Sequence, residues 1–111
     1  MRRALLGLCG LISLAGCGGN EIQGEWSIQM TGSCSGRMTL EGSDSRLTGV
    51  WDCANAQGSV LGSRTGSQVK LTLRAAVLVH PLEVTAALTD GEVRGTVQAP
   101  DYDPHGFVAK R

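Results

Sequence analysis

Hydrophobic and polar residues alternate along most of this chain of 111 residues, from Gln23 to its last residue. The alternation is clear from Trp26 through Ile28 to Met30, with Ser27 and Gln29 between them. A period of two places successive side chains on opposite faces of a strand, so one face is buried and the other is solvated. The pattern is typical of antiparallel sheets that pack one face on a core.

Turn-forming residues divide the alternating region into short pieces, and no piece has the periodicity of a helix. The chain has 16 glycines but only two tryptophans, one tyrosine and one phenylalanine, a bias that favours strands joined by tight turns. The predicted strands span residues 24–31, 35–41, 46–53, 58–63, 67–75, 81–89, 92–98 and 105–110. Short connections favour an all-β, up-and-down antiparallel meander of about eight strands. Closing it into a barrel would remove exposed edges.

The N-terminus has the three parts of an export signal. A charged start, Met1-Arg2-Arg3, precedes an apolar stretch over residues 4–14. That stretch is too short to span a bilayer, which takes ~20 residues, but it fits a signal peptide. Leu14-Ala15-Gly16-Cys17 then matches the lipobox of bacterial lipoproteins. The resemblance implies cleavage between Gly16 and Cys17 and acylation of the Cys17 thiol; the alternative is an ordinary secretory signal with a chance cysteine.

The lipoprotein resemblance implies an organisation and a location. Residues 1–16 form a signal peptide that is removed, residues 17–23 the lipidated cysteine and a flexible tether, and residues 24–111 the β-barrel. Bacterial lipoproteins typically carry about two or three acyl chains, enough for stable anchoring. Gly18, rather than Asp, follows the cysteine and resembles the pattern sent to the outer membrane. The tether reaches at most ~20 Å, so the barrel should lie close to its membrane.

The four cysteines have three expected fates. Cys9 leaves with the signal peptide, Cys17 carries lipid, and Cys34 and Cys53 remain. In an oxidising envelope compartment the remaining two are expected to form a disulfide, with two separate buried thiols as the alternative.

A hairpin centred on Ser43-Asp44 would support that disulfide. This register places Cys34 directly opposite Cys53, and it also pairs Met38 with Gly49 and Gly36 with Trp51. Directly opposed Cβ atoms lie ~4.5–5.5 Å apart, close to the separation that a disulfide needs.

A weak internal repeat centres on glycines within strands. Residues 47–51 (LTGVW) resemble residues 93–97 (VRGTV). Glycine weakens a strand, so its recurrence indicates either a kink that lets the sheet coil or room for a large facing side chain. The predicted register favours the second explanation, because Gly49 would face Met38 and Gly36 would face Trp51.

Gly24-Glu25-Trp26 resembles the G-x-W that opens lipocalins and related small barrels, in which a tryptophan closes the base. An eight-stranded barrel is only just wide enough for its own side chains to fill. The large apolar residues available to fill it are Trp26, Ile28, Met30, Met38, Leu40, Leu47, Trp51, Val60, Val69, Leu71, Leu73, Leu82, Val84, Leu88, Val93, Val97 and Phe107. A second resemblance, in size, early tryptophan and single disulfide, is to small envelope barrels that inhibit metalloproteases through an N-terminal segment.

Few residues of the sequence are candidates for metal binding or catalysis. Asp101, Asp103 and His105 could meet a metal if their segment curled, but a polar loop is the favoured interpretation, and we predict neither a metal site nor a cofactor. His80 precedes Pro81 and is expected in a turn. The sequence has no glycine-rich phosphate loop and no G-x-S-x-G motif, so we predict no enzyme activity. Ten basic residues balance ten acidic ones, without the basic stripe of a nucleic-acid-binding protein.

One segment breaks the alternation. Residues 75–79 (AAVLV) are all apolar and precede His80-Pro81. The favoured interpretation is the buried continuation of a strand, and the alternative is an apolar loop tip that contacts lipid, a partner or a ligand.

The sequence therefore predicts a lipid-anchored envelope lipoprotein whose barrel is a non-enzymatic binding or structural module, in contact with the membrane through Cys17 and with another envelope component through its surface. A lipocalin-like carrier of a small apolar ligand and an envelope protease inhibitor are the alternatives.

Overall fold

The computed structural model describes residues 22–31, 34–54, 56–100 and 102–111. These residues form eight strands and no helix, as the alternation predicts. The strands are β1 (Gly24–Met30), β2 (Cys34–Ser43), β3 (Arg46–Cys53), β4 (Ala56–Thr65), β5 (Gln68–Ala75), β6 (Leu82–Thr89), β7 (Glu92–Ala99) and β8 (Tyr102–Lys110).

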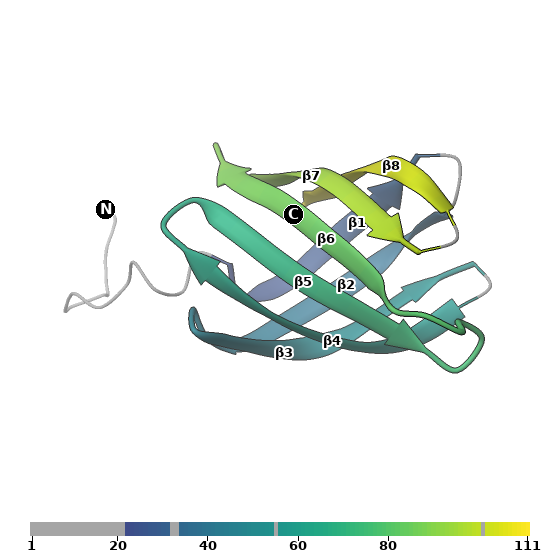
Figure 1. Ribbon diagram of the computed structural model, residues 1–111. Helices are drawn as coiled ribbons and strands as arrows, with labels where there is room; N and C mark the ends of the chain where they lie inside the picture. Colours follow the sequence, from purple (N-terminus) through teal and green to yellow (C-terminus); the bar gives the residue numbers. More distant parts are fainter. Residues whose placement is uncertain (1–21, 32–33, 55, 101) are drawn as a thin grey trace, which may run out of the picture.

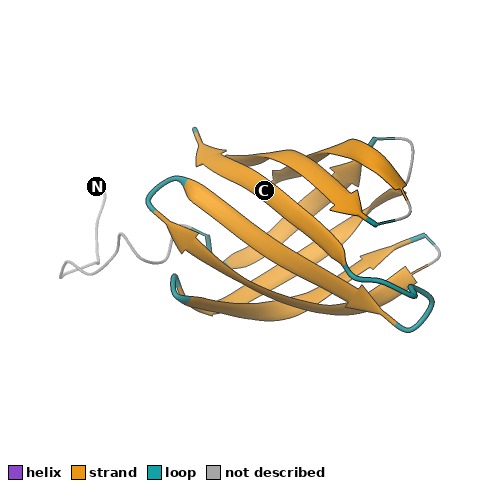
Figure 2. Ribbon diagram, viewed as in Figure 1, coloured by secondary structure: helices purple, strands orange, loops and turns teal. Residues whose placement is uncertain are grey.

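Each strand pairs antiparallel with the next in sequence, and β1 pairs with β8 to close the barrel (Figures 1 and 2). The closing ladder runs from Ser27 opposite Lys110 to Met30 opposite Phe107. Closure leaves no unpaired sheet edge, which is the expected reason for a meander of this kind to form a barrel. The main difference from the predicted boundaries is β8, which begins at Tyr102 rather than at residue 105, because its first residues pair with the end of β7.

The interior is filled with apolar side chains from all eight strands. Of the predicted core residues, only Leu82 and Leu88 are partly rather than fully buried, and both pack against the core. Ile22, which the sequence assigns to the tether, is fully buried in the same cluster. No polar side chain among the described residues is classed as buried, so burial of apolar surface is the main stabilising term for this barrel.

The β2–β3 hairpin forms, but the predicted register is wrong by two residues. Met38 lies opposite Trp51 and Ser43 opposite Arg46, so the turn consists of Asp44 and Ser45 alone. The cause is Gly42, which adopts a φ of 95° and stays within the ladder instead of belonging to the loop. A shift of two residues keeps the same side chains on the inner face, whereas a shift of one would have reversed them.

The disulfide between Cys34 and Cys53 is present, with the two Cα atoms 5.5 Å apart. The prediction that the cysteines are directly opposed is wrong, because Cys53 lies opposite Gly36 and Cys34 lies beyond the end of the β2–β3 ladder.

The strand glycines permit close backbone approach rather than making room for a large side chain. Gly49 lies opposite Leu40, not Met38, and Gly36 lies opposite Cys53, not Trp51. A Cβ atom at Gly49 would lie 1.8 Å from the carbonyl oxygen of Thr39, a distance that no side chain tolerates. Gly95, its counterpart in the repeat, is in the same situation against Thr85. The glycines therefore allow the sheet to bend tightly enough to close.

Candidate functional site: an apolar cup at one end of the barrel

The two ends of the barrel differ in construction. At one end, the closed end, the chain enters β1 beside the β2–β3, β4–β5 and β6–β7 turns (Figure 1). Trp26 is buried there and donates its indole N–H to the carbonyl oxygen of Ile22 at 2.9 Å. The guanidinium carbon of Arg111 lies 4.2 Å from the centre of the Trp26 ring, within the range of a cation–π contact. Trp26 thus connects the residues just before β1 with Arg111 after β8 and closes the barrel base.

A charged group also lies on the outer surface near the closed end. Glu92 accepts a hydrogen bond from Nε of Arg94 at 2.7 Å and lies 3.7 Å from Nζ of Lys110. The hydrogen bond from Arg94, with the nearby positive charges of Arg94 and Lys110, holds the pKa of the Glu92 carboxyl below its usual range.

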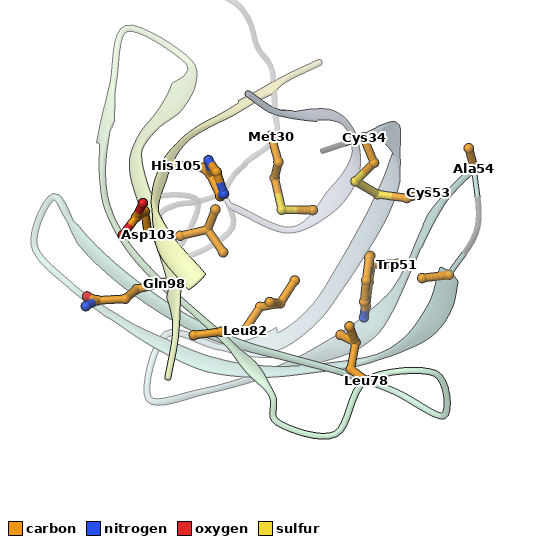
Figure 3. Close-up of a pocket in the computed structure, with 13 residues that line it drawn as sticks. Met30, Cys34, Trp51, Cys53, Ala54, Leu78, Leu82, Gln98, Asp103 and His105 are labelled. Atoms are coloured by element: carbon orange, nitrogen blue, oxygen red, sulfur yellow. A yellow bond between two sulfur atoms is a disulfide. The ribbon is translucent and has the colours of Figure 1, made fainter. Parts of the chain in front are cut away.

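At the other end, the open end, strand ends and the β5–β6 loop surround a half-open cup of about 220 Å³. Figure 3 shows the lining side chains arranged around an empty central space. They come from every strand or from the connection that follows it: Met30, Cys34, Trp51, Cys53, Ala54, Ala56, Leu78, Leu82, Val97, Gln98, Ala99, Asp103 and His105. Most of this lining is apolar, so the cup is chemically suited to an apolar group.

The floor of the cup has no free polar group among its described side chains. Met30, Trp51 and Val97 are at most 3% exposed and form the upper surface of the barrel core. The indole N–H of Trp51 already donates to the carbonyl oxygen of Arg74 at 3.0 Å. A ligand at the floor would therefore meet apolar surface only.

The rim of the cup is apolar on the side of the β5–β6 loop. Leu78 is half-buried and lines the cup, whereas Val77 and Val79 are 68% and 91% exposed. The prediction that residues 75–79 continue a buried strand is wrong, because β5 ends at Ala75 and the amide N–H of Leu78 donates to the Ala75 carbonyl in a turn. The structure agrees with the alternative interpretation, in which these residues form an apolar loop tip.

The disulfide and a polar pair lie on other sides of the rim. Cys34 and Cys53 line the cup and tie the start of β2 to the end of β3. Asp103 and His105 also line it, from strand β8 rather than from the expected polar loop. The described residues contain no group of three or more His, Cys, Asp or Glu side chains that could hold a metal; Asp101, the third residue of the predicted trio, lies outside them. His80 lies in the loop before β6, as expected.

Sequence reasoning identified the apolar segment, the disulfide and two of the polar residues, but not that they meet around one cup. Ala54, Ala56 and Gln98 carried no signal, because an isolated small or polar residue near a strand end is common. Only the order of strands around the barrel brings these connections together.

The predicted lipidation and cleavage sites at Gly16 and Cys17 lie outside the described residues, as do residues 18–21 of the tether. Within the described ranges, no helix is long and apolar enough to cross a membrane. No family model, curated protein or solved structure matches the chain. The fold and the cup define it as a small closed antiparallel barrel with an apolar cup at one end.

Proposed function

We propose that this protein is a lipid-anchored module of the bacterial envelope, which binds another envelope protein through the open end of its barrel. The observation that supports this most directly is an apolar cup with two highly exposed valines beside it, at the same end of the molecule. Exposed apolar surface around a hollow is typical of a site of protein contact.

The position of the chain entry supports the same interpretation. Ile22 and the start of β1 lie at the closed end, and the end of β1 lies at the open end. A lipid on Cys17 would hold the closed end near the membrane through a short tether. The cup would then face away from that membrane, toward other components of the envelope.

The size of the cup favours contact with a protein over carriage of a small apolar ligand. Pockets for drug-sized ligands span ~300–1,000 Å³, and they enclose most of the ligand. The cup measures about 220 Å³ and is half open, while the barrel interior below it is filled by the core. A carrier of an apolar ligand would need the volume that these side chains occupy.

The anchor is tested with two cysteine variants of the full precursor. Cys17→Ser should prevent acylation and leave the precursor uncleaved at this site, as seen by mass spectrometry and membrane fractionation. Cys9→Ser is the matched control, since it changes a cysteine of the same signal segment and should leave lipidation intact. Normal lipid attachment in the Cys17→Ser protein would refute the anchor.

The contact surface is tested with a photoreactive amino acid in cells. Placed at Val79 on the rim, it should crosslink to a defined protein, whereas at Leu61, an exposed residue on the barrel wall, it should not. The crosslink should also disappear when the cup is filled by Ala54→Trp. Equal crosslinking from both positions would contradict binding at the open end.

A further inference from the structure

The chemistry of the cup indicates what it binds: we infer that it accepts one phenylalanine side chain from an extended segment of a partner protein. The inference rests on the proposed function and adds the class of the ligand. Its basis is the volume of the cup, the polarity of its floor, and the groups on its rim.

The volume fits one aromatic ring. An apolar protein cavity of ~150 Å³ is large enough to bind benzene. The cup, at about 220 Å³, holds a ring together with the methylene group that joins it to a backbone. It cannot enclose a larger apolar ligand, because the floor residues Trp51 and Met30 belong to the packed core.

The floor favours phenylalanine over tyrosine. A side chain that enters from the open end places the tip of its ring on the floor, next to Met30, Trp51 and Val97. The only polar group of these three side chains, the Trp51 indole N–H, is bonded to the Arg74 carbonyl. A tyrosine hydroxyl would lose water there without gaining a partner, which should weaken binding by about tenfold or more.

The rim favours a peptide over a simple hydrocarbon. Asp103 and His105 line the cup from β8, and Figure 3 shows the His105 ring beside the central space into which Leu82 points. When a side chain fills the cup, the backbone that carries it lies at rim height. A carboxylate there can accept a backbone N–H, and an imidazole can donate to or accept from the same chain.

The position of the cup favours a protein partner over the two other occupants. The anchoring membrane would be at the closed end, out of reach of the cup. A second copy docked mouth to mouth would place the two closed ends, and so the two lipid anchors, at opposite extremes of the dimer. A segment of a different protein meets neither obstacle.

The test uses methionine methyl NMR on the lipidated protein in nanodiscs of phosphatidylethanolamine and phosphatidylglycerol. Met30 lines the cup, whereas Met38 lies in the core and does not line it, so the second methyl group is an internal reference. N-acetyl-phenylalaninamide should shift the Met30 signal saturably and leave Met38 nearly unchanged. N-acetyl-tyrosinamide should need about a tenfold higher concentration or more for the same shift.

Two variants test the location of binding. Ala54→Trp adds a ring at the rim of the cup and should abolish the Met30 shift. Ala76→Trp, an exposed position of the β5–β6 loop that does not line the cup, is the matched control and should retain it. If Ala54→Trp does not fold, the ratio between the phenylalanine and tyrosine probes still decides the inference without any variant.

Three outcomes would overturn the inference. The first is that neither probe shifts the Met30 signal, and the second is that both probes bind with equal affinity. The third is that a spin-labelled lipid in the nanodisc broadens the Met30 signal, which would mean that the cup contacts the membrane. The proposed anchor fails separately, if mass spectrometry finds no lipid on the mature protein. In that case the same titration is carried out on the protein in solution.

Discussion

The closed and open ends of this barrel are made from the same eight strands, yet the core is closed off at one end and left uncovered at the other. At the closed end a buried tryptophan is held by a hydrogen bond to Ile22 and by the guanidinium of Arg111. At the open end the core stops at Trp51, and strand ends and the β5–β6 loop line a half-open apolar cup above it. The closed end therefore contributes mainly to stability, and the open end carries the surface that we propose binds a partner.

The largest effect is expected from the closed end. Trp26→Ala should lower the free energy of unfolding by about 3–5 kcal/mol, because it removes a fully buried ring and leaves a cavity. Leu78→Ala, at the cup, should cost less, since that side chain is only half-buried. Urea unfolding followed by circular dichroism measures both. Equal losses would contradict the division of roles between the two ends.

A smaller but substantial effect is expected from the disulfide at the open end. Replacing both Cys34 and Cys53 by Ser should cost about 3 kcal/mol in the chain-entropy model for a loop of this size, with a sequence separation of 19. Amide hydrogen exchange should increase most at the start of β2 and the end of β3, beside the cup. Exchange that increases equally at the β4–β5 turn would show that the crosslink stabilises the whole barrel rather than its open end.

The charged group near the closed end should have a weaker, pH-dependent effect. The pKa of Glu92 is lowered from its ordinary value of 4.5, so ionised Glu92 stabilises the folded state above that value. The contribution is lost as the pH falls through the lower pKa of the folded protein. The stability difference between the native protein and Glu92→Gln should therefore be present at neutral pH and vanish in acid, as thermal unfolding at several pH values can measure. Salt should reduce it, because the carboxylate is only half-buried, and a difference that persists in acid would argue against an ionic origin.

The smallest effect on stability is expected from the rim. Val77→Ser combined with Val79→Ser should leave the unfolding midpoint nearly unchanged, within about 0.5 kcal/mol, because both side chains are exposed. The same double variant should weaken crosslinking from the open end to the partner. Val50→Ser, at an exposed position on the barrel wall, is the control that should change neither property.

The alternation of residues was sufficient to predict the strands, because period two is a local property that any half-buried strand must have. It also predicted which side chains face inward, and the two-residue error in the β2–β3 register preserved this, since a shift of two keeps the faces. Gly42 could not be placed correctly from the sequence. Whether a glycine with positive φ belongs to a turn or stays in a ladder depends on the neighbouring strand.

Only individual segments of the candidate site could be predicted from the sequence, not their arrangement around the cup. Residues 75–79 were recognised as an apolar segment, but local sequence cannot distinguish a buried strand end from an exposed loop tip. Asp103 was assigned to a loop and the predicted strand began only at His105, because the pairing with the end of β7 that extends the strand is not visible in the local sequence.

The sequence alone therefore determined a single all-β domain with an apolar inner face and two cysteines within reach of each other. It also supplied the lipobox resemblance, from which the membrane anchor is proposed. Only the tertiary structure decided that the core ends below the open end and that a cup remains there. Local alternation specifies which way each side chain points, whereas the cup depends on which strand ends and loops from distant parts of the chain the barrel brings together.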